Sequence, residues 1–145
     1  MKIGIVGSEA AKFTPETEQL AREAIRDILT KPDVFRTVDT VISGGCHLGG
    51  IDIWAIEEAH KLGMQYFEYL PQTKSWTGYK KRNLEIANNS DILVCITVKS
   101  LPEGYKGMRF PLCYHCGTKD HVKSGGCWTM RQAKKLGKET RLIVI

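Results

Sequence analysis

The chain has 145 residues, of which 42% are apolar and 26% charged, and this length suits one domain over residues 1–145 with a substantial core of its own. No stretch approaches the roughly 18 apolar residues that a membrane span needs, and the opening MKIGIVGSEA has no charged leader, so we expect a cytoplasmic protein without membrane contact. The net charge is +5, but residues 71–145 carry 14 Lys and Arg against 5 Asp and Glu. This asymmetry suggests an anionic partner, a phosphate-bearing metabolite or a nucleic acid, and a merely solvated basic face is an equally good interpretation.

Strand and helix patterns alternate along the whole chain, with no internal repeat. Short apolar runs rich in β-branched residues predict strands, and apolar positions spaced by three or four residues predict helices. The expected elements are strands at 2–6, 38–43, 64–70, 91–98 and 139–145 and helices at 14–29, 51–63, 78–90 and 126–137.

The first two helices carry clear end signals. Thr14 suits the N-cap and Pro15 the first helical position of one helix, and Gly63 suits the C-terminal stop of the next. The faces expected to be buried are Leu20, Ala24 and Ile28 in the first helix and Ile51, Ala55, Ala59 and Leu62 in the second.

This alternation of nearly apolar strands with helices indicates an α/β fold, a Rossmann-like open parallel sheet of five strands with helices on both faces. With right-handed crossovers, a strand order such as 3-2-1-4-5 places the first strand at the centre. Ligands of such sheets bind beyond the carboxyl ends of the strands, where the strand order switches. We therefore expect the functional site at that edge.

Three glycine-bearing loops should converge there. Glycine lets the backbone lie close to a ligand, serine hydroxyls can donate to phosphate oxygens, and two of the loops lead into helix N-termini that favour anions. Such turns also form ordinary corners, but three at one edge favour phosphate binding. The loops comprise Gly7 and Ser8; Ser43, Gly44 and Gly45 with Gly49 and Gly50; and Ser124, Gly125 and Gly126.

Four motifs occur in order: KIGIVGS, VISGGCHLGGIDIWAIEEAHKLG, RNLEIANNSDILVCI and SGGCWTMRQAKKLGKETRLIVI. Together they resemble the SLOG superfamily of Rossmann-like proteins, which includes the Smf/DNA-processing proteins and the Lonely-guy phosphoribohydrolases. The resemblance covers most of the chain outside residues 99–123, and it implies a pocket for a nucleotide or nucleotide-derived phosphorylated ligand. By position, it implies a pocket formed by Ser43, Gly44, Gly45, Asp52, Arg82, Asn83, Gly125, Gly126 and Thr129.

Two departures from the family pattern affect what this resemblance implies. The phosphoribohydrolases share a PGGxGTxxE motif with a catalytic glutamate, whereas this chain reads GGCWTMRQ and has Gln132 at that position. Hydrolysis by that mechanism is therefore not expected. The middle loop is also longer than the SGGxxGxD form, so its ligand geometry cannot be transferred.

Several candidate residues have a second interpretation. Asp52 suits acceptance from ribose hydroxyls, but a first-turn acid also stabilises a helix dipole. Arg82 suits bidentate phosphate contact, although the run KKR is also typical of an exposed face; the resemblance favours the pocket. Trp76 and Trp128 suit stacking on a base as well as ordinary packing.

The segment 110–127 contains cysteine and histidine in metal-ligand spacing, C-x2-C-x4-H-x5-C. Three thiolates and one imidazole suit tetrahedral zinc, which would be structural when four protein ligands bind it. With only three ligands, a water could complete the shell and a hydrolytic role would return. Free thiols or a disulfide are the alternatives, although five cysteines is an odd count and favours a reducing compartment. The expected ligands are Cys113, Cys116, His121 and Cys127, with His115 as a possible replacement for His121.

We therefore expect a sensor or binding module for a nucleotide-like ligand. An enzyme that cleaves an N-glycosidic or phosphate bond of a nucleotide is the first alternative, and a zinc-dependent binder of single-stranded nucleic acid is the second. Whether any bond is cleaved stays open at this point. We also expect a homo-oligomer.

Overall fold

A computed structural model describes residues 1–31 and 37–145 of the chain. It contains the strands and helices that the sequence predicts, with boundaries shifted by up to two residues. The helices are α1 (Pro15–Thr30), α2 (Ile51–Lys61), α3 (Trp76–Asn89) and α4 (Gly125–Lys135), and the strands are β1 (Lys2–Gly7), β2 (Thr40–Gly44), β3 (Gln65–Tyr69), β4 (Ile92–Thr97) and β5 (Glu139–Val144).

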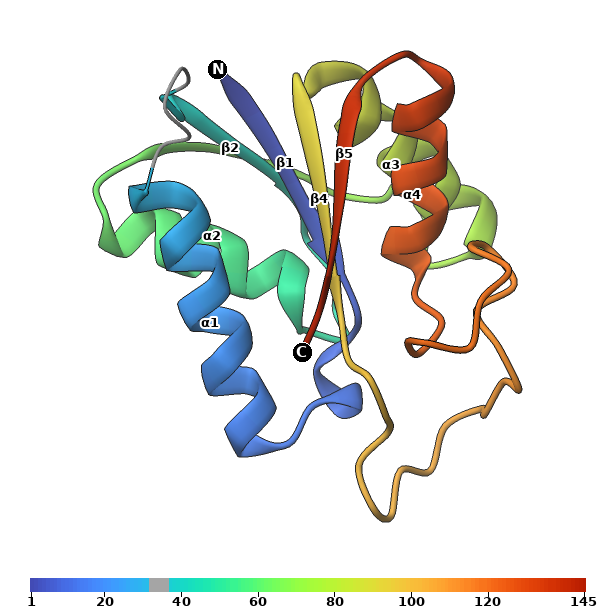
Figure 1. Ribbon diagram of the computed structural model, residues 1–145. Coiled ribbons are helices and arrows are strands. Elements are labelled where there is room, and N and C mark those ends of the chain that lie inside the picture. Colours follow the sequence, from blue (N-terminus) through green and yellow to red (C-terminus); the bar gives the residue numbers. More distant parts are fainter. Residues whose placement is uncertain (32–36) are drawn as a thin grey trace.

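The five strands form one parallel sheet in the order β3-β2-β1-β4-β5, as predicted. α1 and α2 cover one face of the sheet, and α3 and α4 cover the other (Figure 1). The Rossmann-like α/β fold is thus confirmed. Because the strand order reverses at β1, the carboxyl ends of β1, β2 and β4 surround the switch point at which ligands of such folds bind.

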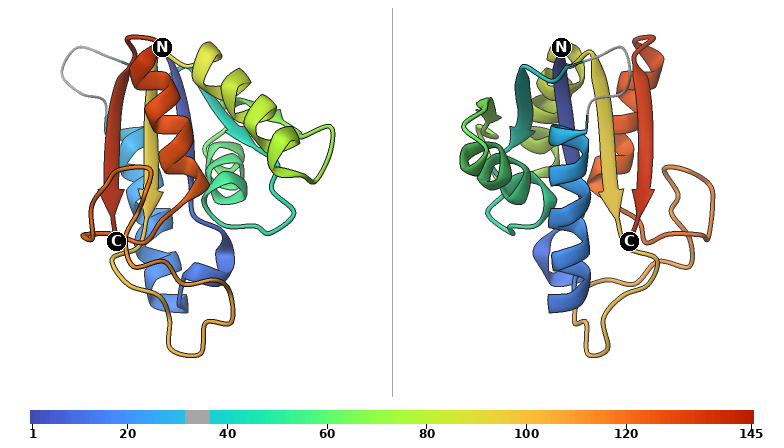
Figure 2. Two further views of the ribbon diagram at one scale, coloured as in Figure 1. Left: turned by 90° about the vertical axis from the view of Figure 1, so that its right-hand side faces the viewer. Right: turned by 60° about the vertical axis from the view of Figure 1, so that its left-hand side comes forward.

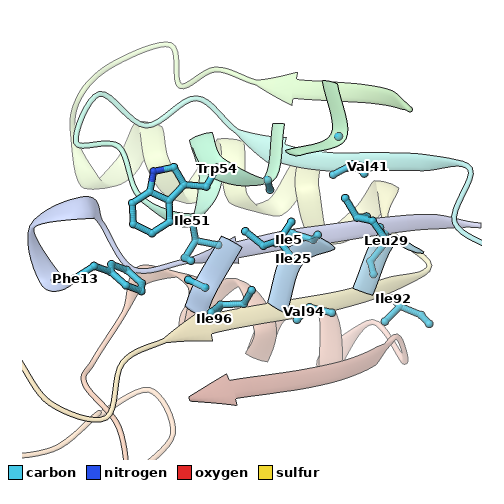
Figure 3. Close-up of a cluster of buried hydrophobic side chains, with 14 of the residues drawn as sticks. Ile5, Phe13, Ile25, Leu29, Val41, Ile51, Trp54, Ile92, Val94 and Ile96 are labelled. Atoms are coloured by element: carbon cyan, nitrogen blue, oxygen red, sulfur yellow. The ribbon is translucent and has the colours of Figure 1, made fainter. Parts of the chain in front are cut away.

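Side chains from β1, β4, α1 and α2 form the larger core cluster, shown in Figure 3. α1 turns Ala21, Ile25 and Leu29 into this cluster. The predicted face was wrong by one position, because Leu20 is 51% exposed. α2 buries Ile51, Ala55 and Ala59 as predicted, whereas Leu62, which follows its last turn, is exposed.

The opposite face of the sheet packs against α3 and α4 in a second cluster. This cluster contains Ile86 from α3 and Ala133 from α4, together with three cysteines, Cys95, Cys113 and Cys127. The long segment between β4 and α4 therefore contributes to the core through Cys113, and the partly buried Cys116 packs against the same cluster.

That segment lies beyond the carboxyl ends of β4 and β5 (Figure 2). Main-chain and side-chain hydrogen bonds attach it to the sheet: Val122 N donates to Val98 O at 2.9 Å, and Thr97 Oγ1 donates to Val122 O at 2.8 Å. It therefore forms part of the wall around the switch point.

At the opposite side of the sheet, β3 is an edge strand with largely exposed side chains, among them Phe67 at 58% exposure. Among the described residues, no helix is long and apolar enough to cross a membrane. The expectation of a homo-oligomer stays a prediction.

Candidate functional site

A cavity of about 230 Å³ lies at the carboxyl edge of the sheet, where β1 ends and α2, α3 and α4 begin. Parts of all three glycine-bearing loops line this cavity, so the loops lie close together as the sequence predicts. The sequence-predicted residues that line the cavity are Gly7, Ser8, Asp52, Arg82, Asn83, Gly125, Gly126 and Thr129.

The remaining predicted residues lie behind this lining. Ser43 Oγ donates to Ile5 O at 2.5 Å, so its hydroxyl binds the neighbouring strand. Gly44 lies so close to Arg82 and Asp52 that a Cβ there would overlap both side chains. Ser43 and Gly44 therefore support the cavity from the sheet side.

Arg82 is 5% exposed, and its guanidinium connects the ends of two strands. Its Nη1 donates to Gly45 O at 3.3 Å and Tyr69 O at 3.2 Å, which lie at the ends of β2 and β3. Its Nε donates to Asn83 Oδ1 at 2.7 Å. Arg82 thus holds the loop after β2 in place and also lines the cavity.

Asp52 completes this arrangement from the first turn of α2. Its carboxylate lies 3.4 Å from Arg82 Nη2 and accepts a hydrogen bond from Gly7 N at 3.3 Å. Burial raises the pKa of Asp52 to about 6, outweighing Arg82 and the Gly7 N–H, which favour the ionised form. Asp52 therefore joins the loop after β1 to α2 and α3.

The N-terminus of α4 opens directly into the cavity. Ser124 caps the helix by accepting from Gly126 N at 3.0 Å. The N–H of Gly125 has no hydrogen-bond partner within residues 1–31 and 37–145, and the space where its Cβ would stand is open. A free helix N–H beside open space is the arrangement that binds an anionic oxygen.

Two lysines that the sequence analysis missed also line the cavity. Lys12 lies in a short 3₁₀ turn (Ala10–Lys12) after β1, and Lys123 directly precedes Ser124. Lys12 Nζ donates to Lys123 O at 2.7 Å, and burial lowers the pKa of Lys12. Their closeness in sequence to the first and third glycine loops is the signal that would have found them.

Aromatic side chains form the cavity wall on the α3 side. Trp76 and Tyr79 line the cavity, and Trp76 is 46% exposed. Trp128 packs against Trp76 with ring centroids 5.8 Å apart, outside the lining. Of the two tryptophans, Trp76 is therefore the one in position to contact a molecule in the cavity.

A compact group of metal-ligating side chains lies beside this cavity. The ligand atoms all lie within 4.8 Å of one another, and all five cysteines of the chain are free thiols. The four residues are the predicted ones, Cys113, Cys116, His121 and Cys127.

Local backbone geometry positions the first two cysteines. Cys116 N and Gly117 N both donate to Cys113 O, at 3.2 and 2.7 Å, and Gly117 adopts a positive φ of 72°. This tight turn brings the Cys113 and Cys116 side chains to the same side of the chain. Burial raises the pKa of Cys116 to about 12, so the Cys116 thiol would ionise only with a cation beside it.

The histidine is oriented for ligation. His121 Nδ1 is hydrogen-bonded to Asp120 Oδ1 at 2.7 Å, while Nε2 lies 3.7 Å from Cys127 Sγ. A carboxylate on one ring nitrogen fixes the tautomer that presents the other nitrogen to a metal. His115, the alternative ligand, lies outside the group: its Nε2 is buried and has no partner among the described residues. The three cysteines and His121 can therefore hold a metal ion, with His121 as the histidine ligand.

The fold and this site define a Rossmann-like protein with a ligand cavity at the switch point and a Cys/His group beside it. No family model matches the sequence, and no curated protein sequence matches it. Among solved structures, the chain is similar to the molybdenum cofactor carrier protein of Chlamydomonas reinhardtii, with a TM-score of 0.60 and 19% identity over 97% of this chain and 74% of that one. This likeness shows a shared fold.

Proposed function

We propose that the protein is a sensor or binding module for a nucleotide or nucleotide-derived phosphorylated ligand, held in the cavity at the carboxyl edge of the sheet. The observation that carries this proposal is the N-terminus of α4. There the N–H of Gly125 lies beside open space, in a cavity that the backbone of Gly7 also lines. Lys12 and Lys123 supply positive charge there, and Trp76 offers an aromatic surface for a base.

Two further points support a small phosphorylated ligand. The similar solved structure is described as a carrier of the molybdenum cofactor, so a protein of this fold serves as a small-cofactor carrier. The ordered motifs that resemble the SLOG superfamily point to the same class of ligand. We place the chain in that superfamily as part of this proposal.

Binding fits the lining of the cavity better than hydrolysis does. Asp52, the buried carboxyl group there, is paired with Arg82 and accepts from Gly7 N. Gln132, at the position of the phosphoribohydrolase glutamate, does not line the cavity. A glutamine side chain cannot accept a proton as a general base near neutral pH.

We propose zinc as the ion at Cys113, Cys116, His121 and Cys127. Three thiolates and one imidazole match the tetrahedral preference of zinc, and four protein ligands leave no open position. Zinc there would be structural. It would hold the third glycine loop in place, because Cys127 lies in the first turn of α4.

The substitution Gly125→Asp tests the cavity directly. No atom lies within 4 Å of a Cβ at Gly125, so the fold should persist, while the new carboxylate repels a phosphate at the α4 N-terminus. We expect at least about a tenfold loss of affinity for nucleotides that bind the wild type, measured by calorimetry over the common bases.

Gly125→Asn is the matched control for this substitution. It adds a side chain of nearly the same size without the charge, so it separates charge repulsion from steric filling. Equal affinities of wild type and Gly125→Asp would show that the α4 N-terminus does not bind the phosphate.

A further inference from the structure

A second cavity, of about 330 Å³, adjoins the first. Lys12 and Lys123 line both cavities, so the two share a wall. Most of the second lining comes from the segment between β4 and α4, the part of the chain that the SLOG resemblance does not cover. This cavity is therefore an individual feature of the protein.

The lining of the second cavity is strongly cationic and contains no carboxylate. Within the described part of the chain, none of its lysine or arginine side chains forms an ion pair, while His121 is hydrogen-bonded to Asp120. The five cationic residues are Lys12, Lys99, Arg109, Lys119 and Lys123.

Neutral groups hold the two lysines of the shared wall. Lys12 Nζ donates to the Lys123 carbonyl oxygen, and Lys123 Nζ lies 4.9 Å from the ring centroid of Phe110 and 5.2 Å from that of Tyr114. These partners are uncharged and orient the ammonium groups, and Glu9, in the lining of the first cavity, offsets only part of the charge of Lys12. Cations of one sign around a hollow concentrate anions within it.

The volume of the first cavity limits how much of a nucleotide it can hold. At about 230 Å³ the first cavity lies below the roughly 300 Å³ at which ordinary small-molecule pockets begin. A base, a ribose and one phosphate would fill it. Any further phosphates would need the space across the Lys12 and Lys123 wall, where the positive charge is concentrated.

We propose that the ligand is a nucleotide with an extended phosphate chain, two phosphates or more, whose terminal phosphates lie in the second cavity. This inference rests on the proposed function of the first cavity and adds the class of ligand. Lys99, Arg109 and Lys119 would then bind the terminal phosphates, while Lys12 and Lys123 bind the phosphates at the junction.

Calorimetry at constant ionic strength tests the proposal, with the mono-, di- and triphosphates of the common nucleosides and with inorganic tripolyphosphate. We expect the triphosphate to bind about tenfold or more tightly than the monophosphate of the same nucleoside. In a Lys99→Ala, Lys119→Ala double variant, this preference should disappear while monophosphate affinity stays unchanged, because both lysines line only the second cavity.

Lys106→Ala with Lys135→Ala is the matched control, since it removes two exposed lysines that line neither cavity. Equal affinity of the wild type for mono- and triphosphates would overturn the inference and leave the proposed function standing. Tripolyphosphate binding without any nucleotide binding, lost in the double variant, would overturn the proposed function while supporting a polyphosphate site. Tight single-stranded DNA or RNA binding that the double variant loses, without triphosphate preference, would assign these lysines to nucleic acid and overturn the inference.

Discussion

The Asp52 carboxyl group links the stability of the protein to pH. Burial raises its pKa to about 6 in the folded protein, above the ordinary value of 3.8. A group with a raised folded pKa contributes stability that is fully present below the unfolded pKa and is lost as pH rises through the folded pKa. The contribution of Asp52 should therefore decline between about pH 4 and about pH 6.

Asp52→Asn isolates this contribution, because an amide of similar size cannot ionise. We expect the stability of the wild type relative to the variant to fall by on the order of 2 kcal/mol from near pH 4 to near pH 7. Urea unfolding of both proteins at the two pH values measures it. A difference that is constant with pH would show that the ion pair with Arg82 compensates the burial of Asp52.

Single residues also show where sequence reasoning reaches its limit in this protein. The types and positions of Asp52, Arg82 and Gly125 marked them as candidates, and all three line the cavity. The sequence did not show that Arg82 would be bound by the ends of β2 and β3, since that depends on where the chain folds back. Lys12 and Lys123 are 111 positions apart, and only the sheet topology brings them together.

At the level of elements, the strand order could be predicted. The alternation of strand and helix patterns can be seen locally in the sequence, and the right-handed crossover rule holds for parallel sheets in general. The buried face of α1 was harder to predict. Apolar residues recur every four positions both from Leu20 and from Ala21, so either set could be the buried face of a helix. The smaller Ala21 permits close packing of the helix, and Leu20 is left exposed.

The Cys/His group should hold the start of α4, so Cys116→Ser tests the coupling between metal and ligand cavity. Loss of one thiolate opens the coordination shell, and we expect zinc content to fall several-fold and the melting temperature to fall by roughly 5 °C or more. Ligand affinity should also fall, although Cys116 does not line the ligand cavity. Metal analysis, thermal unfolding and calorimetry measure the three effects.

Cys46→Ser serves as the control for metal content, because Cys46 lies outside the Cys/His group. If Cys116→Ser retained a full equivalent of zinc, the four-residue site would be wrong. Zinc loss with unchanged ligand affinity would show that α4 keeps its position without the metal.

Across the whole molecule, the charge asymmetry seen in the sequence becomes a local feature. Four of the five cationic residues around the second cavity, Lys99, Arg109, Lys119 and Lys123, belong to the basic half of the chain. Composition predicts an anionic partner only in general terms, since it cannot show whether positive charge surrounds a hollow or extends along a surface. That distinction separates a nucleotide from a nucleic acid.

Salt dependence of binding separates these two partners in solution. An oligonucleotide that contacts many basic side chains releases many counterions, so the logarithm of its affinity falls with the logarithm of salt concentration by about 0.7 for each phosphate neutralised on a single strand. A nucleotide has too few phosphates to carry the condensed counterion layer of an oligonucleotide, so even beside the five cationic residues of the second cavity its slope should be much shallower. Fluorescence anisotropy with a labelled nucleoside triphosphate and labelled single-stranded DNA and RNA, across one salt series, compares them. We expect the nucleotide to bind more tightly at physiological salt, where a steep slope weakens the oligonucleotide most. Tight oligonucleotide binding with a steep slope, and no measurable nucleotide binding, would make the basic segment between β4 and α4 a nucleic-acid surface instead.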